Sequence, residues 1–212
     1  IPVPALGTHA GAVADRFHGA PSRRLWVAGV TGTNGKTSVC HFAAQALQAA
    51  EGRPVGVLGT LGHGLADALE EPSHTTPDVL EVHRRLADLA AAGVARVVME
   101  ASSHGLDQGR VDGVRFAAAA FTNLSRDHLD YHGTLEAYAA AKRRLFAVPG
   151  LGQAVIDRAD AEGRRIAAGL APGVELLGYS AAGDAGARLR CEAAAAVPGG
   201  LRLTLAADGV RR

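Results

Sequence analysis

The chain has 212 residues, which fits one good-sized domain with at most a remnant of another. Hydrophobic residues make up 48% of the chain and aromatic residues only 4%, so the core must be built mainly from alanine, valine and leucine. The net charge of +1 does not indicate a nucleic acid or an anionic membrane as the main partner, and no apolar run reaches the roughly 18 residues of a membrane span.

The first residues, Ile-Pro-Val-Pro, lack the basic and apolar regions of a signal peptide, and the absence of an initial methionine suggests a fragment. The two cysteines, Cys40 and Cys191, cannot form a disulfide framework, so we expect reduced thiols in a cytoplasmic protein. Of the 22 basic residues, only Lys36 and Lys142 are lysines. Because arginine is used almost everywhere else, these two positions are candidates for chemistry that a guanidinium cannot perform.

In chain order, residues 5–17 are expected to form a short helix and residues 19–22 a linker. Strands are then expected at residues 25–30, 55–60, 95–101, 116–124 and 153–157, and helices at residues 36–50, 78–92, 135–146 and 159–168. This alternation predicts an α/β fold with a mostly parallel sheet flanked by helices. Two further segments, 188–196 and 201–206, flank Pro198-Gly199-Gly200 and predict a C-terminal antiparallel hairpin.

A glycine-rich segment, Gly29-Val-Thr-Gly-Thr-Asn-Gly-Lys-Thr37, lies between the first of these strands and the next helix. Glycines let backbone N–H groups point at phosphate oxygens, Lys36 can reach the β- and γ-phosphates, and the Thr37 hydroxyl can bind Mg²⁺. The strict Walker pattern requires glycine where this chain has Val30, so a turn without a ligand is the alternative interpretation. Residues 62–64, Gly-His-Gly, are interpreted as a plain loop.

The variant Gly-Thr-Asn-Gly-Lys-Thr at residues 32–37 resembles the phosphate loop of Mur ligases and folylpolyglutamate synthetases. Four further segments narrow the resemblance: His74-Thr-Thr-Pro-Asp78, Glu100-Ala-Ser-Ser-His-Gly-Leu-Asp-Gln-Gly-Arg110, Phe121-Thr-Asn-Leu-Ser-Arg-Asp-His-Leu-Asp-Tyr-His-Gly133 and Glu136-Ala-Tyr-Ala-Ala-Ala-Lys142. Together they resemble the Mur ligases that add the third peptide residue to UDP-N-acetylmuramoyl-L-alanyl-D-glutamate. The resemblance is dense from about residue 25 to about residue 157 and thins beyond it.

The resemblance implies that ATP activates a carboxylate as an acyl phosphate, which the amine of a diamino acid then displaces. It implies that residues 1–24 are the end of an N-terminal UDP-binding domain and its linker, that residues 25–212 are an incomplete ATP-binding central domain, and that a C-terminal amino-acid-binding domain is absent. We therefore expect a fragment that binds ATP and Mg²⁺ but is inactive alone. Diaminopimelate, lysine and ornithine all remain open as the added residue.

The resemblance also assigns roles residue by residue. ATP would be bound by Gly32, Thr33, Asn34, Gly35, Lys36, Thr37 and Ser38. Two Mg²⁺ ions would be held by Thr37, Glu100, His128 and a carbamylated Lys142, and the catalytic residues would be Lys36, Lys142 and His128. The UDP-muramyl dipeptide would contact Thr75, Thr76, Ser102, Gln108 and Arg110, whereas Ser103 and His104 are expected to be structural.

Each assignment has a simpler alternative. Glu100 could be a solvated acid at a strand end, His128 a surface histidine in a polar loop, and Lys142 an exposed helix lysine beside two arginines. For the whole chain, one alternative is a ligase of the folylpolyglutamate or cyanophycin synthetase type. The other is a nucleotide-binding module without catalysis of its own.

Overall fold

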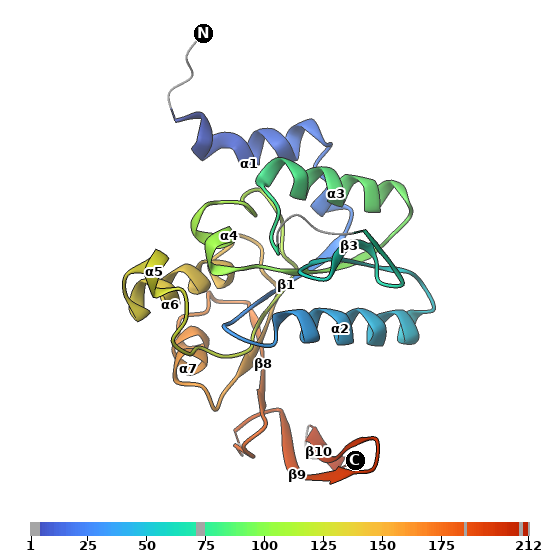
Figure 1. Cartoon of the computed structure of the whole chain (residues 1–212), viewed down its shortest axis with the longest axis vertical. Coiled ribbons are helices and arrows are strands. Elements are labelled where there is room, and N and C mark those ends of the chain that lie inside the picture. The colour runs from blue at the N-terminus through green and yellow to red at the C-terminus, as the bar shows by residue number, and fades with distance from the viewer. Residues whose placement is uncertain (1–4, 71–74, 185, 208–209, 212) are drawn as a thin grey trace.

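The computed structural model describes residues 5–70, 75–184, 186–207 and 210–211. Its centre is an 11-stranded sheet with the strand order β11-β10-β9-β8-β7-β6-β1-β5-β2-β3-β4 (Figure 1). The parallel strands are β1 (Trp26–Thr31), β2 (Val55–Gly59), β5 (Arg96–Glu100), β6 (Ala118–Phe121), β7 (Gln153–Asp157), β8 (Glu175–Ser180) and β9 (Leu189–Val197). The expected mostly parallel sheet is therefore confirmed.

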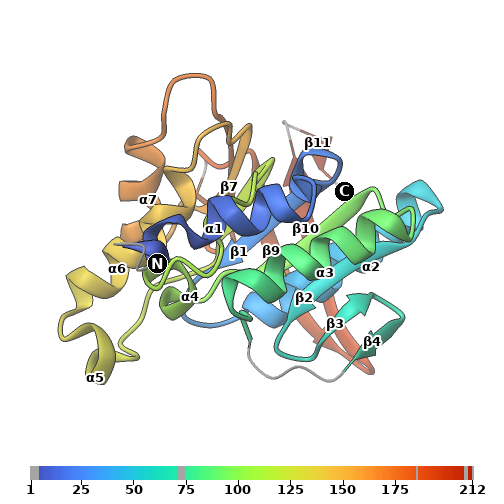
Figure 2. The same cartoon turned by 90° about the horizontal axis from the view of Figure 1, so that it is seen from above.

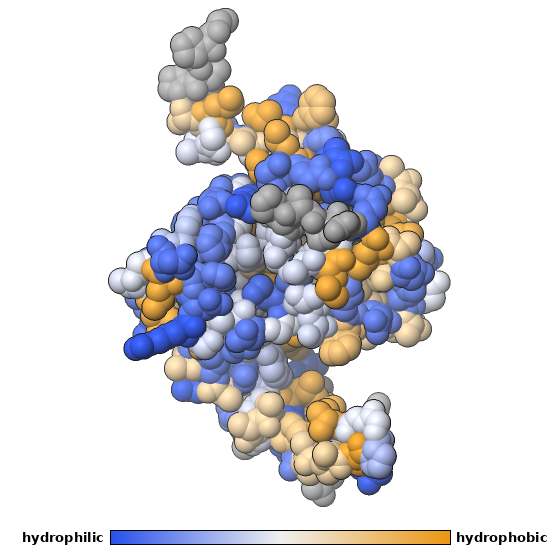
Figure 3. All heavy atoms as spheres, in the orientation of Figure 1, coloured by the Kyte–Doolittle hydropathy of each residue, from blue (hydrophilic) through white to orange (hydrophobic). Residues whose placement is uncertain are grey.

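Antiparallel strands extend both edges of this sheet. One edge carries β3 (Gly62–Leu65) and β4 (Ala68–Glu70), and the other carries β10 (Gly200–Ala207) and β11 (Val210–Arg211). The β9–β10 pair is the predicted C-terminal hairpin. Several of its leucines are exposed, and Figure 3 shows apolar surface at the end of the molecule where the hairpin lies.

Helices cover the sheet around β1, β2, β5 and β7, whereas β9 is largely exposed. They are α1 (Leu6–Phe17), α2 (Lys36–Glu51), α3 (Val79–Ala91), α4 (Ser103–Asp107), α5 (Leu129–His132), α6 (Leu135–Arg143) and α7 (Ala161–Ala168), with 3₁₀ turns at Pro21–Arg23 and Arg144–Phe146. Figures 1 and 2 show α2 on one face of the sheet and α1 and α3, side by side, on the other. No helix in the described ranges is long and apolar enough to cross a membrane.

The apolar strands produce two core layers because successive side chains of a strand point to opposite faces of the sheet. Val98 belongs to the same cluster as Cys40 and Ala44 of α2, whereas its neighbours Val97 and Met99 belong to the larger cluster on the opposite face. Strand β2 is buried along its whole length, as expected for a strand covered on both faces.

The structure corrects the interpretation of residues 62–64 as a plain loop. These residues begin β3, which pairs with β2 and β4. The φ angles of Gly62 (150°) and Gly64 (136°) explain why glycine is needed here, and a Cβ at Gly62 would lie 2.6 Å from the Cβ of Leu69. Strand β8 was not predicted, because its short apolar run at 176–177 is bounded by glutamate and glycine.

Two predicted elements are shorter than expected. The strand predicted at 116–124 is regular only over Ala118–Phe121, because residues 122–125 leave the sheet to contact the glycine-rich segment. The helix predicted at 135–146 changes to a 3₁₀ turn at Arg144.

The contact between α1 and the rest of the chain depends on Gly11. A Cβ at Gly11 would lie 2.4 Å from the carbonyl oxygen of Asp112, whereas a Cβ at Gly7, in the same helix, would meet nothing within 4 Å. We expect Gly11→Ala to lower the free energy of unfolding by about 1–3 kcal/mol, because backbone must move to make room. Urea unfolding measures this change.

Gly7→Ala is the matched control for that measurement. It adds the same methyl group to the same helix without a clash, so we expect unchanged stability or a gain of up to about 1 kcal/mol. Equal stability of the two variants would show that α1 does not depend on the close approach at Gly11.

Candidate active site

A cavity of about 500 Å³ lies at the carboxyl ends of β1, β2 and β5. The order of the strands changes direction here: the chain runs from β1 to β2 toward one edge of the sheet and from β5 to β6 toward the other edge. Open α/β sheets bind ligands at such a switch point. The cavity is lined by Thr33, Asn34, Gly35, Lys36, Thr37, Thr60, Thr75, Thr76, Glu100, Ser102, His104, Arg110 and His128. Sequence positions far apart therefore meet at one edge of the sheet.

The glycine-rich segment forms a tight loop between β1 and α2. Gly32 and Gly35 have φ angles of 147° and 85°, and a Cβ at Gly32 would lie 1.9 Å from the Thr122 hydroxyl oxygen. The Lys36 Nζ donates to the carbonyl oxygens of Gly32 (3.0 Å) and Thr33 (2.9 Å), so the ammonium lies over the loop. The N-terminus of α2 also faces the cavity, and helix N-termini attract anions.

Residues 122–123, directly after β6, hold this loop in place by hydrogen bonds. The Thr33 N–H donates to the Asn123 carbonyl (2.8 Å), and the Asn123 side chain accepts from the Asn34 N–H (3.1 Å) and donates to the Asn34 carbonyl (3.0 Å). The Thr122 hydroxyl donates to the same carbonyl at 2.7 Å. Sequence reasoning did not single out these two residues, although their position directly after a strand could have indicated them.

Glu100 ends β5 and points into the cavity, with only 1% of its surface exposed. Its Oε2 accepts from the Thr37 hydroxyl at 3.1 Å, and its Oε1 accepts from the Thr60 N–H at 2.7 Å. The alternative of a solvated strand-end acid is therefore wrong for this residue. Thr60 was also missed by sequence reasoning.

Lys142 is buried rather than exposed, with 1% of its surface accessible. Its Nζ donates to the Gly32 carbonyl at 2.7 Å and lies 4.2 Å from the centre of the Tyr138 ring. Within the described residues, no carboxylate forms an ion pair with it. Burial, and then the neighbouring Lys36 ammonium, lower the pKa of Lys142 to about 7.

His128 lies at the rim of the cavity, with a left-handed backbone φ of 49° and a side chain 46% exposed. Left-handed backbone in a non-glycine residue is uncommon and concentrates at functional sites. His104 packs against His128, with 4.9 Å between ring centres, and also lines the cavity. Ser103 contacts His132 at 3.0 Å, a contact between α4 and α5.

The residues expected to contact the muramyl peptide fall into two groups. Thr75, Thr76, Ser102 and Arg110 line the cavity, and the Arg110 guanidinium donates to the Thr76 carbonyl at 2.9 Å. Gln108 does not line it, but accepts from Arg110 at 2.8 Å and so fixes that guanidinium. His74 lies outside the described residues. Of the expected ATP-binding residues, Gly32 and Ser38 are not part of the cavity wall.

The oxygen donors near the glycine-rich loop suit a hard divalent cation. Thr37 and Glu100 supply oxygen ligands, and Mg²⁺ usually takes one or two protein oxygens, with waters and phosphates completing its octahedron. Within the described ranges no group of three or more His, Cys, Asp or Glu side chains could hold a metal ion by itself. The residues therefore fit a metal that is bound together with a nucleotide.

Comparisons with known proteins agree with this geometry. Residues 30–206 match the model of the Mur ligase middle domain. The UDP-N-acetylmuramoyl-L-alanyl-D-glutamate–2,6-diaminopimelate ligase of Alkalilimnicola ehrlichii is 53% identical over 208 residues, which cover 98% of this chain and 42% of that protein. The ligase of the same name from Pseudomonas aeruginosa is 56% identical over 194 residues, covering 92% of this chain and 39% of the relative.

Solved structures give the same result. A structure of a UDP-N-acetylmuramoyl-L-alanyl-D-glutamate–2,6-diaminopimelate ligase superposes with a TM-score of 0.82 at 36% identity, over 94% of this chain and 42% of the other. Mycobacterium tuberculosis folylpolyglutamate synthase, complexed with ADP and AMPPCP, gives a TM-score of 0.70 at 20% identity, over 92% and 50% of the two chains, and shows only a shared fold. The chain thus spans about two fifths of the curated relatives' length. Because residues 30–206 match the middle-domain model and the relatives are more than half identical to this chain, the chain belongs to the Mur ligase family.

Proposed function

We propose that this chain is the ATP-binding core of a ligase that joins a diamino acid to UDP-N-acetylmuramoyl-L-alanyl-D-glutamate through an acyl phosphate. The observation that carries the proposal is the convergence of Lys36, Thr37 and Glu100 on one cavity, beside Thr75 and Arg110. The names of the relatives support 2,6-diaminopimelate as the added residue. Because ATP and nucleotide sugars are made in the cytoplasm, we place the reaction there.

In this proposal the loop at residues 32–38 binds the ATP phosphates. The α2 N-terminus faces the cavity, and Lys36 can turn from its two loop carbonyls toward phosphate oxygens. Transfer of a phosphoryl group builds negative charge on its oxygens, so positioned cations provide most of the catalysis. Lys36 supplies one such cation.

Mg²⁺ ions would supply the other cations and neutralise charge on the phosphates. Thr37 and Glu100 would hold one ion, and His128 with a carbamylated Lys142 would contribute to a second. His128 stands at the cavity rim, and Lys142 lies behind the phosphate loop against Gly32.

Carbamylation of Lys142 is supported by its surroundings. CO₂ reacts only with a neutral amine, and with a pKa of about 7 roughly half of the Lys142 side chains are neutral at pH 7. An ordinary lysine would be neutral in only about one molecule in three thousand. The adjacent Lys36 ammonium, which disfavours a second positive charge, favours the anionic carbamate.

The acceptor substrate would lie along the wall formed by Thr75, Thr76, Ser102 and Arg110, with Gln108 orienting the arginine. Hydroxyl groups suit sugar and peptide groups, and a guanidinium suits a carboxylate. We also propose that residues 1–24 are the exit from a UDP-binding domain and that residues 25–212 belong to the ATP-binding domain. The position of the family match within 30–206 supports this division.

Nucleotide binding is the direct test of the proposal. Calorimetry on the 212-residue chain should show that ATP binds at least about tenfold more tightly with Mg²⁺ than with EDTA. The reason is that the metal ion would separate the Glu100 carboxylate from the negatively charged ATP phosphates. Ligation with UDP-muramyl dipeptide and diaminopimelate should be negligible for this chain and measurable for a full-length relative. Absence of ATP binding would refute the proposed core, and turnover by this chain alone would refute its dependence on further domains.

A further inference from the structure

Thr60, directly after β2, provides most of the contacts to the Glu100 carboxylate. Its backbone N–H donates to Oε1 at 2.7 Å and its hydroxyl donates to Oε2 at 3.2 Å. The Thr37 hydroxyl donates the third hydrogen bond, to Oε2 at 3.1 Å. Because Thr37 would turn toward a bound metal, Thr60 is the residue that can hold Glu100 in place before and after metal binding.

The Thr60 hydroxyl also reaches the wall proposed for the acceptor substrate. Its oxygen lies 3.0 Å from the Thr75 hydroxyl oxygen. A carboxylate can only accept, and Thr60 has a single hydroxyl hydrogen, so all partners are satisfied when Thr75 donates to Thr60 and Thr60 donates to Glu100. The three residues then form one directional chain of hydrogen bonds from Thr75 to Glu100.

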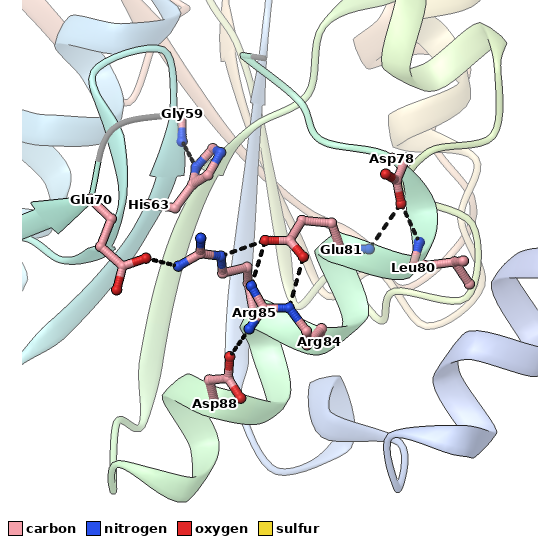
Figure 4. Close-up of polar contacts among 9 residues, drawn as sticks. All are labelled: Gly59, His63, Glu70, Asp78, Leu80, Glu81, Arg84, Arg85 and Asp88. Carbon is pink, nitrogen blue, oxygen red and sulfur yellow. Dashed lines mark hydrogen bonds and ion pairs between the residues drawn. The ribbon is translucent and has the colours of Figure 1, made fainter. Parts of the chain in front are cut away.

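The residue before Thr60, Gly59, is held by a hydrogen bond to His63 (Figure 4). The Gly59 N–H donates to Nδ1 of His63 at 3.3 Å, and this imidazole is buried, which lowers its pKa and keeps Nδ1 free to accept. Gly59 also makes room for the carboxylate, since a Cβ there would lie 2.4 Å from Oε1 of Glu100. Thr60 is thus placed by the β2–β3 connection and not by the phosphate loop.

The strands beyond this turn are tied to α3. Arg85 pairs with Glu70 at the end of β4 and, at 2.7 Å, with Glu81 on its own helix (Figure 4). The β3–β4 hairpin that follows Thr60 is therefore held at two places, by the buried His63 and by this ion pair.

We propose that Thr60 is a positioning residue that sets the Glu100 carboxylate for the metal and couples it to Thr75 in the acceptor wall. This inference rests on the proposed function. Thr60 would act only through Glu100 and would not contact the nucleotide. It should therefore change the Mg²⁺ requirement of ATP binding without changing the affinity for metal-free ATP.

Thr60→Val and Thr60→Ser separate this role from a general loss of structure. Valine has nearly the shape of threonine but no hydroxyl, whereas serine retains it. Calorimetric ATP titrations at a series of Mg²⁺ concentrations should show that Thr60→Val needs about tenfold more Mg²⁺ for half-maximal binding, as expected for one lost hydrogen bond to a charged group. Thr60→Ser should behave like the unaltered chain, and in EDTA all three should bind ATP equally.

The outcomes distinguish this inference from the function on which it rests. If the unaltered chain binds no ATP, the proposed function fails. If the unaltered chain binds Mg²⁺ and ATP together and Thr60→Val has the same Mg²⁺ midpoint, only the role of Thr60 is overturned. Thermal unfolding of each variant shows whether it is folded. A weaker affinity of folded Thr60→Val in EDTA would also overturn the inference, because Thr60 would then act on the nucleotide site.

The link to Thr75 is tested by a double-mutant cycle. Thr75→Val should raise the Mg²⁺ midpoint about twofold to threefold, because Thr60 then loses the hydroxyl that orients its own. In the Thr60→Val background, Thr75→Val should add no further shift. Independent shifts that multiply in the double variant would show that the two hydroxyls do not act as one chain.

Discussion

Lys36→Met is expected to lower the affinity of the chain for ATP with Mg²⁺ by about a hundredfold or more. The Lys36 ammonium is partly buried over the phosphate loop and is held by the Gly32 and Thr33 carbonyls, 3.0 and 2.9 Å away. Burial lowers the pKa of Lys36 because the buried ammonium has lost part of its hydration. Hydrogen bonds to phosphate oxygens would therefore stabilise this cation strongly. Two charge-assisted hydrogen bonds, each contributing roughly 1.5–3 kcal/mol, account for such a loss, which calorimetry would measure.

Arg53→Met is the matched control, because it removes one positive charge beyond the opposite end of α2, at an exposed position. It should leave ATP affinity within about twofold, since exposed charges at such distances are screened by salt. If Lys36→Met binds ATP as tightly as Arg53→Met does, the phosphates do not lie on this loop.

The features that the sequence predicted well are local ones. The loop at residues 32–37 is recognisable because glycines, lysine and threonine stand together between a strand and a helix. The family resemblance assigned Glu100, and its place at the end of an apolar strand agrees with that role, because the carboxyl ends of parallel strands meet at one edge of the sheet. The hairpin around Gly199 was likewise visible from its turn residues.

The features that escaped prediction depend on which strands become neighbours. Thr60 reaches Glu100 only because β2 pairs with β5, and Asn123 reaches the phosphate loop only because β6 pairs with β1. Neither pairing is adjacent in the chain order, so spacing alone cannot indicate it. The burial of His63 depends in the same way on β3 folding back along β2.

The surroundings of Lys142 show a second limit. Arg143 and Arg144 follow it, and three consecutive basic residues are typical of a solvated helix face. The structure instead directs Arg143 toward Glu136 and Glu162, while Lys142 donates to the Gly32 carbonyl of the glycine-rich loop. The scarcity of lysine in the composition and the family resemblance of residues 136–142 marked this position beforehand.

Lys142→Met is expected to change how stability depends on pH. Lys142 has a folded-state pKa of about 7 and an unfolded-state value near 10.5, so between these values the unfolded chain binds more protons. The unaltered chain should therefore gain stability as pH rises from about 7 to about 10, and the full cost of the buried charge should be present below pH 7. Relative to Lys142→Met, this gain should be about 2–5 kcal/mol between pH 6 and pH 10, measured by urea unfolding in CO₂-free buffer.

The measurement compares the stability of the unaltered chain and of Lys142→Met as a function of pH, so the contributions of all other titrating groups cancel. Methionine is a suitable reference because it is similar in size to lysine and has no proton to lose. Parallel curves would mean that Lys142 keeps an ordinary pKa when folded. Adding ¹³C-labelled bicarbonate should then produce a carbamate signal in the NMR spectrum of the unaltered chain that is missing from the spectrum of Lys142→Met. If the two pH curves differ but the carbamate signal is absent, burial still explains the lowered pKa of Lys142. Carbamylation would then be contradicted, because a neutral amine would be present and CO₂ would still not react.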